Sequence, residues 1–127
     1  MPTFKRLIRP HVARELRTAR DAEARGHAAL AFAHLERAHV LGQASTAMHV
    51  LVHWRMFAWG LRQRRATECL GQVVRLIGAA TKTAFGLVPV GNTGGSNVSP
   101  FRRMPLPPDL EATIAVATPS GSRPRCP

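Results

Sequence analysis

Helix-breaking residues divide the first 85 positions of the chain into four segments, each long enough to form an α-helix. Gly26 and Gly42 are typical of helix C-termini, and the polar run 63–65 is typical of a turn. Pro10 suits the first turn of a helix, where its missing N–H costs nothing. The sequence therefore predicts helices over about 10–25, 27–41, 45–61 and 67–84, and the short connections pair them as two antiparallel hairpins.

Apolar residues recur at helical spacing in each segment and indicate which face is buried. In the first two helices the inner stripes comprise Val12, Leu16, Ala19, Ala22, Ala31, Leu35 and Ala38. A partly overlapping set resembles the small-residue positions of a tetratricopeptide hairpin: Ala19, Ala22, Gly26, Ala28, Ala31, Leu35 and Ala38. In the third helix we expect the core face to be Val50, Leu51, Trp54, Phe57, Ala58 and Leu61. The clearest helical periodicity in the chain is that of Leu70, Val73, Val74 and Ile77 in the fourth helix.

The composition of the chain changes after Phe85, and residues 86–108 contain five prolines and four glycines, which are unfavourable in a long helix. We expect an extended arm over 86–112 that packs its apolar residues on the helices. Within it, the run 91–97 is rich in Gly and Asn, which supply positive-φ turns, and its side chains could instead lock the arm to the helices. The overall prediction is an all-α helical domain over 10–85, with a basic lead over 1–9 and a disordered tail over 113–127.

Composition limits the classes of function. The net charge is +11, but all except two of the 18 basic residues are arginines scattered along an alanine-rich chain that has no tyrosine, so we expect no specific nucleic-acid partner. Cys69 and Cys126 form no disulfide framework, which favours a reducing compartment. No apolar run has the length of a membrane span or of a signal peptide, and we expect a cytoplasmic protein without a membrane partner.

Five of the six histidines lie between residues 27 and 53. His49 and His53 are four residues apart, so their imidazoles share one face of the third helix, and this spacing is typical of two ligands to one transition metal ion. Met56 follows on the same side, and its thioether would favour softer ions such as Cu(I).

The antiparallel arrangement brings His39, at the end of the second helix, near His49. At about 100° per residue, the side of His49, His53 and Met56 points away from the expected core face, toward solvent or another neighbour. His34 lies about 140° around the second helix from His39, so both do not easily reach one ion. We therefore predict a site for Zn, Ni, Co or Cu on His39, His49 and His53, with His34 and Met56 as further candidates. The alternative is a pH-sensing or purely structural role for these histidines.

No nucleophile, base and carboxylate stand in a recognisable catalytic pattern, so we expect a protein that is not an enzyme. The competing function is a helical interaction module without a ligand that binds a protein partner or forms a homo-oligomer. Its contact surface would include Trp59, which falls outside the expected core face; alternatively, the C-terminal arm covers that side chain.

Three stretches together resemble a family of small bacterial proteins known only as a domain of unknown function. They are HLERAHVLGQ at 34–43, HVLVHWRMFAWGLRQRRATECLGQVVRLIGA at 49–79, and PVGNTGGSNVSPFRRMPLPPDL at 89–110. The resemblance covers about residues 12–112 and brings no established activity. It implies an association with heavy-metal resistance, which favours the metal interpretation of His34, His39, His49 and His53.

Overall fold

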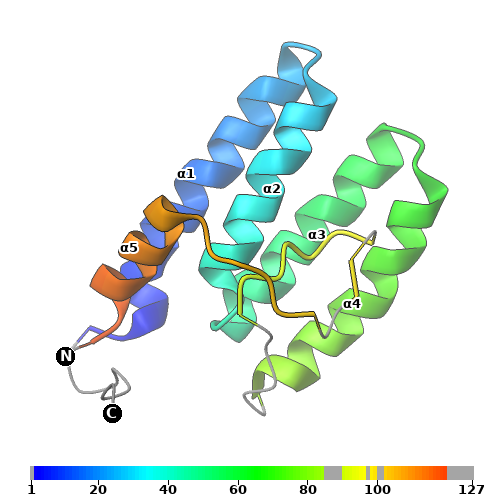
Figure 1. Ribbon diagram of the computed structural model, residues 1–127. Helices are drawn as coiled ribbons and strands as arrows, with labels where there is room; N and C mark the ends of the chain where they lie inside the picture. Colours follow the sequence, from blue (N-terminus) through cyan, green and yellow to red (C-terminus); the bar gives the residue numbers. More distant parts are fainter. Residues whose placement is uncertain (1, 85–89, 97, 100–101, 120–127) are drawn as a thin grey trace.

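The protein is a bundle of five α-helices in the computed structural model, which describes residues 2–84, 90–96, 98–99 and 102–119 (Figure 1). The helices are α1 (Phe4–Ala24), α2 (Ala28–Gly42), α3 (Thr46–Arg62), α4 (Ala66–Ala84) and α5 (Pro108–Ala117). The described ranges contain no β-strand. The all-α prediction is thus confirmed, and a fifth, short helix is added to the four expected from the sequence.

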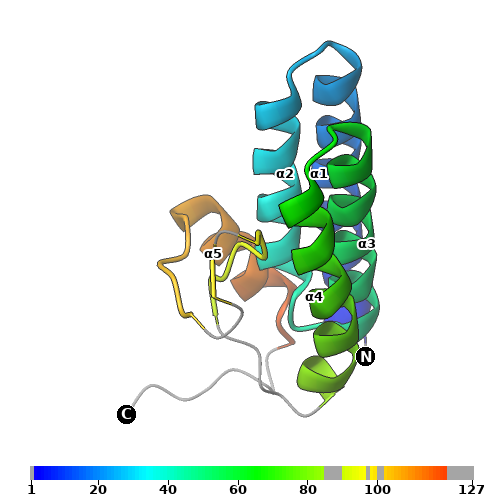
Figure 2. The ribbon, with the colours of Figure 1, turned by 90° about the vertical axis from the view of Figure 1, so that its right-hand side faces the viewer.

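Two antiparallel hairpins form the body of the molecule. α1 packs along α2, α3 packs along α4, and the hairpins meet where α2 contacts α3 (Figure 1). Figure 2 shows α5 and the described part of the arm together on one side of these four helices. Within the described part of the chain, α4 contacts no helix other than α3. None of the described helices has both the length and the apolar character that a membrane span requires.

The first helix begins at Phe4, whereas the sequence pattern predicts a start at Pro10, so most of the expected basic lead over 1–9 is helical. The Thr3 hydroxyl caps the helix by accepting a hydrogen bond from the Arg6 N–H at 3.4 Å. Ile8 is fully buried, and Phe4 packs against the same core. This packing offsets the hydrogen bond that an internal Pro10 removes from α1.

The inner stripes expected for the first hairpin are confirmed, since all of their residues are buried in one core cluster. The core face expected for the third helix is wrong. Trp54 is 55% exposed and Leu61 is 58% exposed. The buried residues of α3 are instead those of the histidine side and the flank next to it: Met48, His49, Val52, His53, Met56, Trp59 and Gly60. Because α3 is apolar on several sides, its pattern does not reveal which side its two neighbouring helices cover.

Trp59 is buried. The sequence predicts that this side chain contacts either a protein partner or the arm, but residues of α2 cover it. Its indole N–H donates a hydrogen bond to the Ala28 carbonyl at 3.1 Å, and its ring lies against Phe32 with the ring centroids 4.5 Å apart. The start of α2 therefore covers this side of α3.

The C-terminal part of the chain returns to the first hairpin. α5 packs on α1 and α2 through Leu110 and Ala117, which are both buried. This helix lies at positions expected to belong to the arm and to the disordered tail. Pro108 stands at its start, where a proline is well tolerated, so the prolines of this region do not prevent a helix. Of the expected arm, 86–89, 97 and 100–101 lie outside the described residues, and so do 120–127 of the expected tail.

Candidate metal centre

The imidazoles of His39, His49 and His53 converge on one point between α2 and α3. The Nε2 atom of His39 lies 3.0 Å from Nε2 of His49 and 3.2 Å from Nε2 of His53. All three side chains are buried, with at most 6% of any residue exposed. The predicted grouping of these three histidines is therefore present in the structure as a triad of side chains whose ligand atoms all lie within 4.8 Å of one another.

The hydrogen bonds on the far side of two rings determine where their protons are. Nδ1 of His39 lies 2.6 Å from the backbone carbonyl of Asn92, which can only accept, so this nitrogen carries a proton. Nδ1 of His53 lies 2.6 Å from Oε1 of Gln72 and is the donor there as well. In the neutral rings, the Nε2 atoms of His39 and His53 consequently carry no proton. Two lone pairs thus face each other across 3.2 Å.

The orientation of the Gln72 amide follows from its other contacts. Its Nε2 donates to the carboxylate of Glu68 at 2.6 Å and to the Gly94 carbonyl at 2.9 Å, both of which can only accept. Its Oε1 must therefore face His53. A fully buried glutamine that links an imidazole to a carboxylate resembles the outer shell of a metal site, where such partners orient the ligand ring.

The arm closes over the triad through close backbone contacts. Gly94 has a φ of +80°, and a Cβ at this position would lie 2.5 Å from the His39 ring. Asn92 locks the turn, since its side-chain amide donates to the carbonyls of Ser99 and Arg102 and its oxygen accepts from the Gly94 N–H. The expected positive-φ turn is confirmed at Gly91 and Gly94. The Asn92 side chain bonds within the arm, whereas the Ser96 hydroxyl makes the alternative contact, a side-chain bond to a helix, at Glu68 of α4.

Further bonds tie the arm to α4. Arg75 donates to the carbonyls of Gly94 and Val98, and the Glu68 carboxylate accepts from the Ser96 hydroxyl and backbone N–H. The arm is thereby attached to the helix that carries Gln72, the hydrogen-bond partner of His53.

Burial lowers the pKa of His39 well below its usual range, because the ring has lost its contact with water. The nearby imidazoles of His53 and His49 lower it further, since a second positive charge beside theirs is unfavourable. The ring is therefore neutral at physiological pH, which is the form that binds metal ions.

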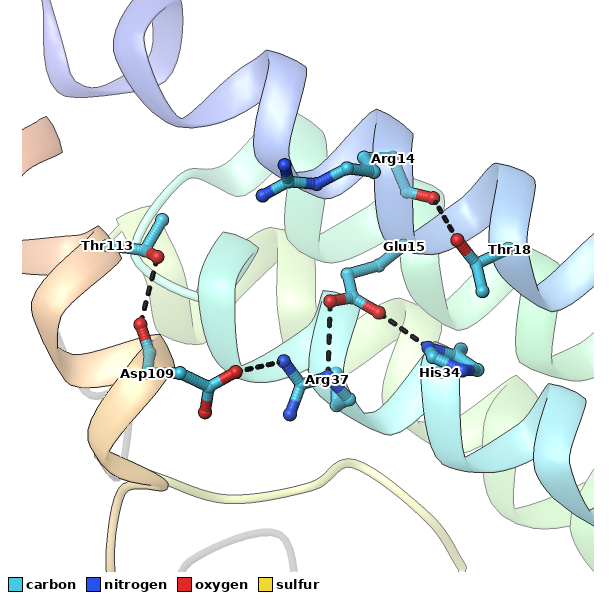
Figure 3. A network of polar contacts seen from close by, with 7 residues as sticks. All are labelled: Arg14, Glu15, Thr18, His34, Arg37, Asp109 and Thr113. Atoms are coloured by element: carbon cyan, nitrogen blue, oxygen red, sulfur yellow. Dashed lines mark hydrogen bonds and ion pairs between the residues drawn. The ribbon is translucent and has the colours of Figure 1, made fainter.

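The other two predicted ligands lie elsewhere or have another environment. His34 is paired with Glu15 of α1, and its Nδ1 lies 2.7 Å from the carboxylate (Figure 3). The same carboxylate accepts from Arg37, which also pairs with Asp109 of α5. His34 is thus part of a surface network between three helices rather than of the triad. Met56 is fully buried among the apolar core residues.

The outer contacts of the triad were not predicted from the sequence. Gln72 lies on the side of α4 opposite the regular stripe of Leu70, Val73 and Ile77, and it shares that side with Glu68 and Arg75. Such a polar side is typical of a solvated helix face, so the pattern gives no signal of a contact with the triad. The Gly- and Asn-rich run 91–97 predicts turns or a lock on the helices, but no contact between Asn92 and His39. This contact joins positions 53 residues apart, which local patterns do not reveal.

Comparison with known proteins gives a family and no activity. A family model described as a protein of unknown function, DUF3703, matches residues 6–114, which confirms the resemblance to a family of this kind and extends its range at both ends. Searches of curated proteins and of solved structures found no significant match.

Proposed function

Since the chain belongs to this family of unknown function, we propose its role from the geometry of the site: the protein binds a transition metal ion through His39, His49 and His53. The observation that carries the proposal is the convergence of three buried Nε2 atoms, two of them on rings whose protons are held on Nδ1. A cation at their centre would replace the repulsion between facing lone pairs with three coordinate bonds.

The spacing of the nitrogens supports this proposal. A metal ion bound at about 2.0–2.1 Å by three imidazoles in tetrahedral directions holds the nitrogens roughly 3.3 Å apart. The distances of 3.0 and 3.2 Å from the His39 nitrogen are close to that value. The third separation, between His49 and His53, is at most 4.8 Å, so a bound ion would draw these two rings together. Nitrogen ligands of this type suit Zn(II), Cu, Ni(II) and Co(II), which makes these ions the candidates.

The surroundings of the triad also favour a cation. The three imidazoles contribute no negative charge, but the Glu68 carboxylate lies two hydrogen bonds away from His53, through Gln72. A carboxylate in this outer position raises the basicity of the ligand without binding the ion itself. The carbonyl of Asn92 does the same for His39.

The alternative without metal is a shared proton between two of the rings, which corresponds to a structural or pH-sensing role. A neutral His49 ring that carries its proton on Nε2 can donate it to Nε2 of His39. The contact between His39 and His53 then still joins two unprotonated nitrogens, because both rings hold their protons on Nδ1. A metal ion satisfies both contacts at once, and we therefore favour metal binding.

The test is elemental mass spectrometry on the full chain purified without a polyhistidine tag, followed by titration with Zn(II), Ni(II), Co(II) and Cu(I). We expect about one ion per chain, bound at micromolar concentration or tighter. His49→Ala combined with His53→Ala should abolish this binding and leave a helical circular dichroism spectrum. Removing the two ligands leaves a single imidazole, which is too few for tight binding.

His34→Ala is the matched control, because it removes a half-buried histidine of α2 that is bound to Glu15. We expect this variant to keep its metal content and affinity. Equal and weak binding by the native chain, the double variant and the control would overturn the proposal. It would leave a helical interaction module as the function.

A further inference from the structure

Six large apolar side chains are exposed on α3 and α4, on the outer side of the second hairpin. They range from 45% to 71% exposed, and we call them the apolar face: Trp54, Leu61, Leu70, Val73, Val74 and Ile77. Four of them follow the i, i+3, i+4, i+7 spacing of a helix that packs against another helix. This regular stripe therefore lies in water, although its pattern is that of a contact surface.

The described part of the chain offers no helix to cover this face, since α4 packs on α3 alone. The face is also uncharged. The charged residues of α4 between positions 66 and 81 are Glu68 and Arg75, and both bond to the arm on another side of the helix. In a molecule with a net charge of +11, the α4 part of this face thus carries no charge. On α3, the Arg62 guanidinium next to Leu61 is bonded to Glu23 of α1.

The area of the face is large for a monomer. An aromatic side chain exposes on the order of 150–250 Å² when free and an aliphatic one somewhat less, so these six residues, at 45% to 71% exposed, together present roughly 600 Å². This is at the upper end of the largest apolar patch on typical monomers, about 300–600 Å². If two copies met through it, these side chains alone would bury about 1,200 Å², the lower limit for a stable interface.

We propose that this face binds a second copy of the same chain, so that the α3–α4 hairpins of two protomers form a four-helix bundle. A two-fold axis would place the same surface on both sides, which suits a patch that is uncharged and apolar throughout. Two antiparallel helical hairpins packed face to face are a common architecture, and each protomer would supply the neighbours that α4 lacks.

Charge favours a second copy over an anionic partner. An acidic protein or an anionic membrane would be attracted to arginines, and the apolar face carries none. Two copies can meet here without placing like charges in contact. The inference is independent of metal binding, because none of the six residues belongs to the histidine triad.

Sedimentation equilibrium of the full chain between 1 and 200 µM tests the proposal. We expect a species of twice the 13.9 kDa chain mass. Val74→Glu combined with Ile77→Glu should give a monomer over the whole range, with an unchanged helical spectrum. Val116→Glu is the matched control, because Val116 is 78% exposed on α5, and this variant should remain a dimer.

A second measurement does not depend on the glutamate variant. In a Trp59→Phe chain, Trp54 is the one remaining tryptophan, and its emission should shift to the blue as the concentration rises through the dimerisation range. A native chain that is monomeric at all concentrations would overturn the proposal. So would a monomer whose face binds anionic lipid vesicles and loses that binding in the Val74→Glu/Ile77→Glu variant.

Discussion

The imidazole of His39 is held on three sides. Its Nδ1 donates to the arm at Asn92, its Nε2 faces the other two imidazoles, and the Gly94 backbone lies directly against the ring. A side chain larger than hydrogen at position 94 would both displace the ring and strain a backbone with a φ of +80°. The position of this one ring therefore depends on the arm as much as on α2.

At the same scale, Gln72→Met tests whether the outer contacts orient the ligands. Methionine has a similar volume but neither accepts from His53 nor donates to Glu68, so the His53 ring loses its orientation and its fixed proton. We expect the metal affinity to fall about 10- to 100-fold, as for other outer-shell partners, measured by competition with a chelator. Gln63→Met, in the turn after α3, should leave the affinity unchanged. An unchanged affinity in Gln72→Met would contradict the proton assignment.

Between elements, a charged pair ties α1 to the end of α3. Arg62 donates two hydrogen bonds to the Glu23 carboxylate, at 2.6 and 2.9 Å. These bonds lower the pKa of Glu23, since they favour its charged form more than burial disfavours it. This ion pair joins the two hairpins at α1 and α3, in addition to the contact between α2 and α3.

Glu23→Gln should destabilise the protein at pH 7 by about 0.5 kcal/mol, a small value because Arg62 is more than half exposed. A carboxyl whose pKa is lowered by folding stabilises the fold above its unfolded pKa, about 4.3, and this contribution is lost as the pH falls through the folded value. The difference between native and variant should therefore shrink between pH 5 and pH 3 in urea denaturation. Glu111→Gln, exposed on α5, should show no such change. A difference that is constant with pH would indicate lost packing rather than lost charge.

The helices and the shared face of His49 and His53 were largely predictable because both are local features. Gly26, Gly42 and the polar run 63–65 predicted the three turns between the first four helices correctly. The i, i+4 spacing of His49 and His53 predicted that these two side chains share one face of α3. The side of α3 that is buried was predicted wrongly, since Trp54 and Leu61 look like core residues in any count of apolar positions. Only the arrangement of neighbouring helices shows that the histidine side faces inward, and a single helix does not encode that arrangement.

For the whole molecule, the balance between a cationic charge and an uncharged contact surface leads to a prediction about salt. Repulsion between two chains of net charge +11 opposes dimerisation and is screened at high ionic strength, whereas the apolar contact is not weakened. We expect the dimer to dissociate less readily in 500 mM than in 50 mM NaCl, measured by sedimentation equilibrium. Weaker association at high salt would contradict an interface made of the apolar face and indicate ion pairs instead.

The arm that covers the triad also bears on the order in which the parts of the chain fold. Each hairpin forms from segments adjacent in the chain, whereas the bond between His39 and Asn92 closes a loop of 53 residues. Closing a longer loop costs more chain entropy, so we expect the hairpins to form first and the arm to dock after them. During synthesis, all three histidines have left the ribosome well before Asn92. For the proposed metal site, an ion that arrives before docking would meet an uncovered cluster, whereas one that arrives after docking would meet a cluster covered by the arm.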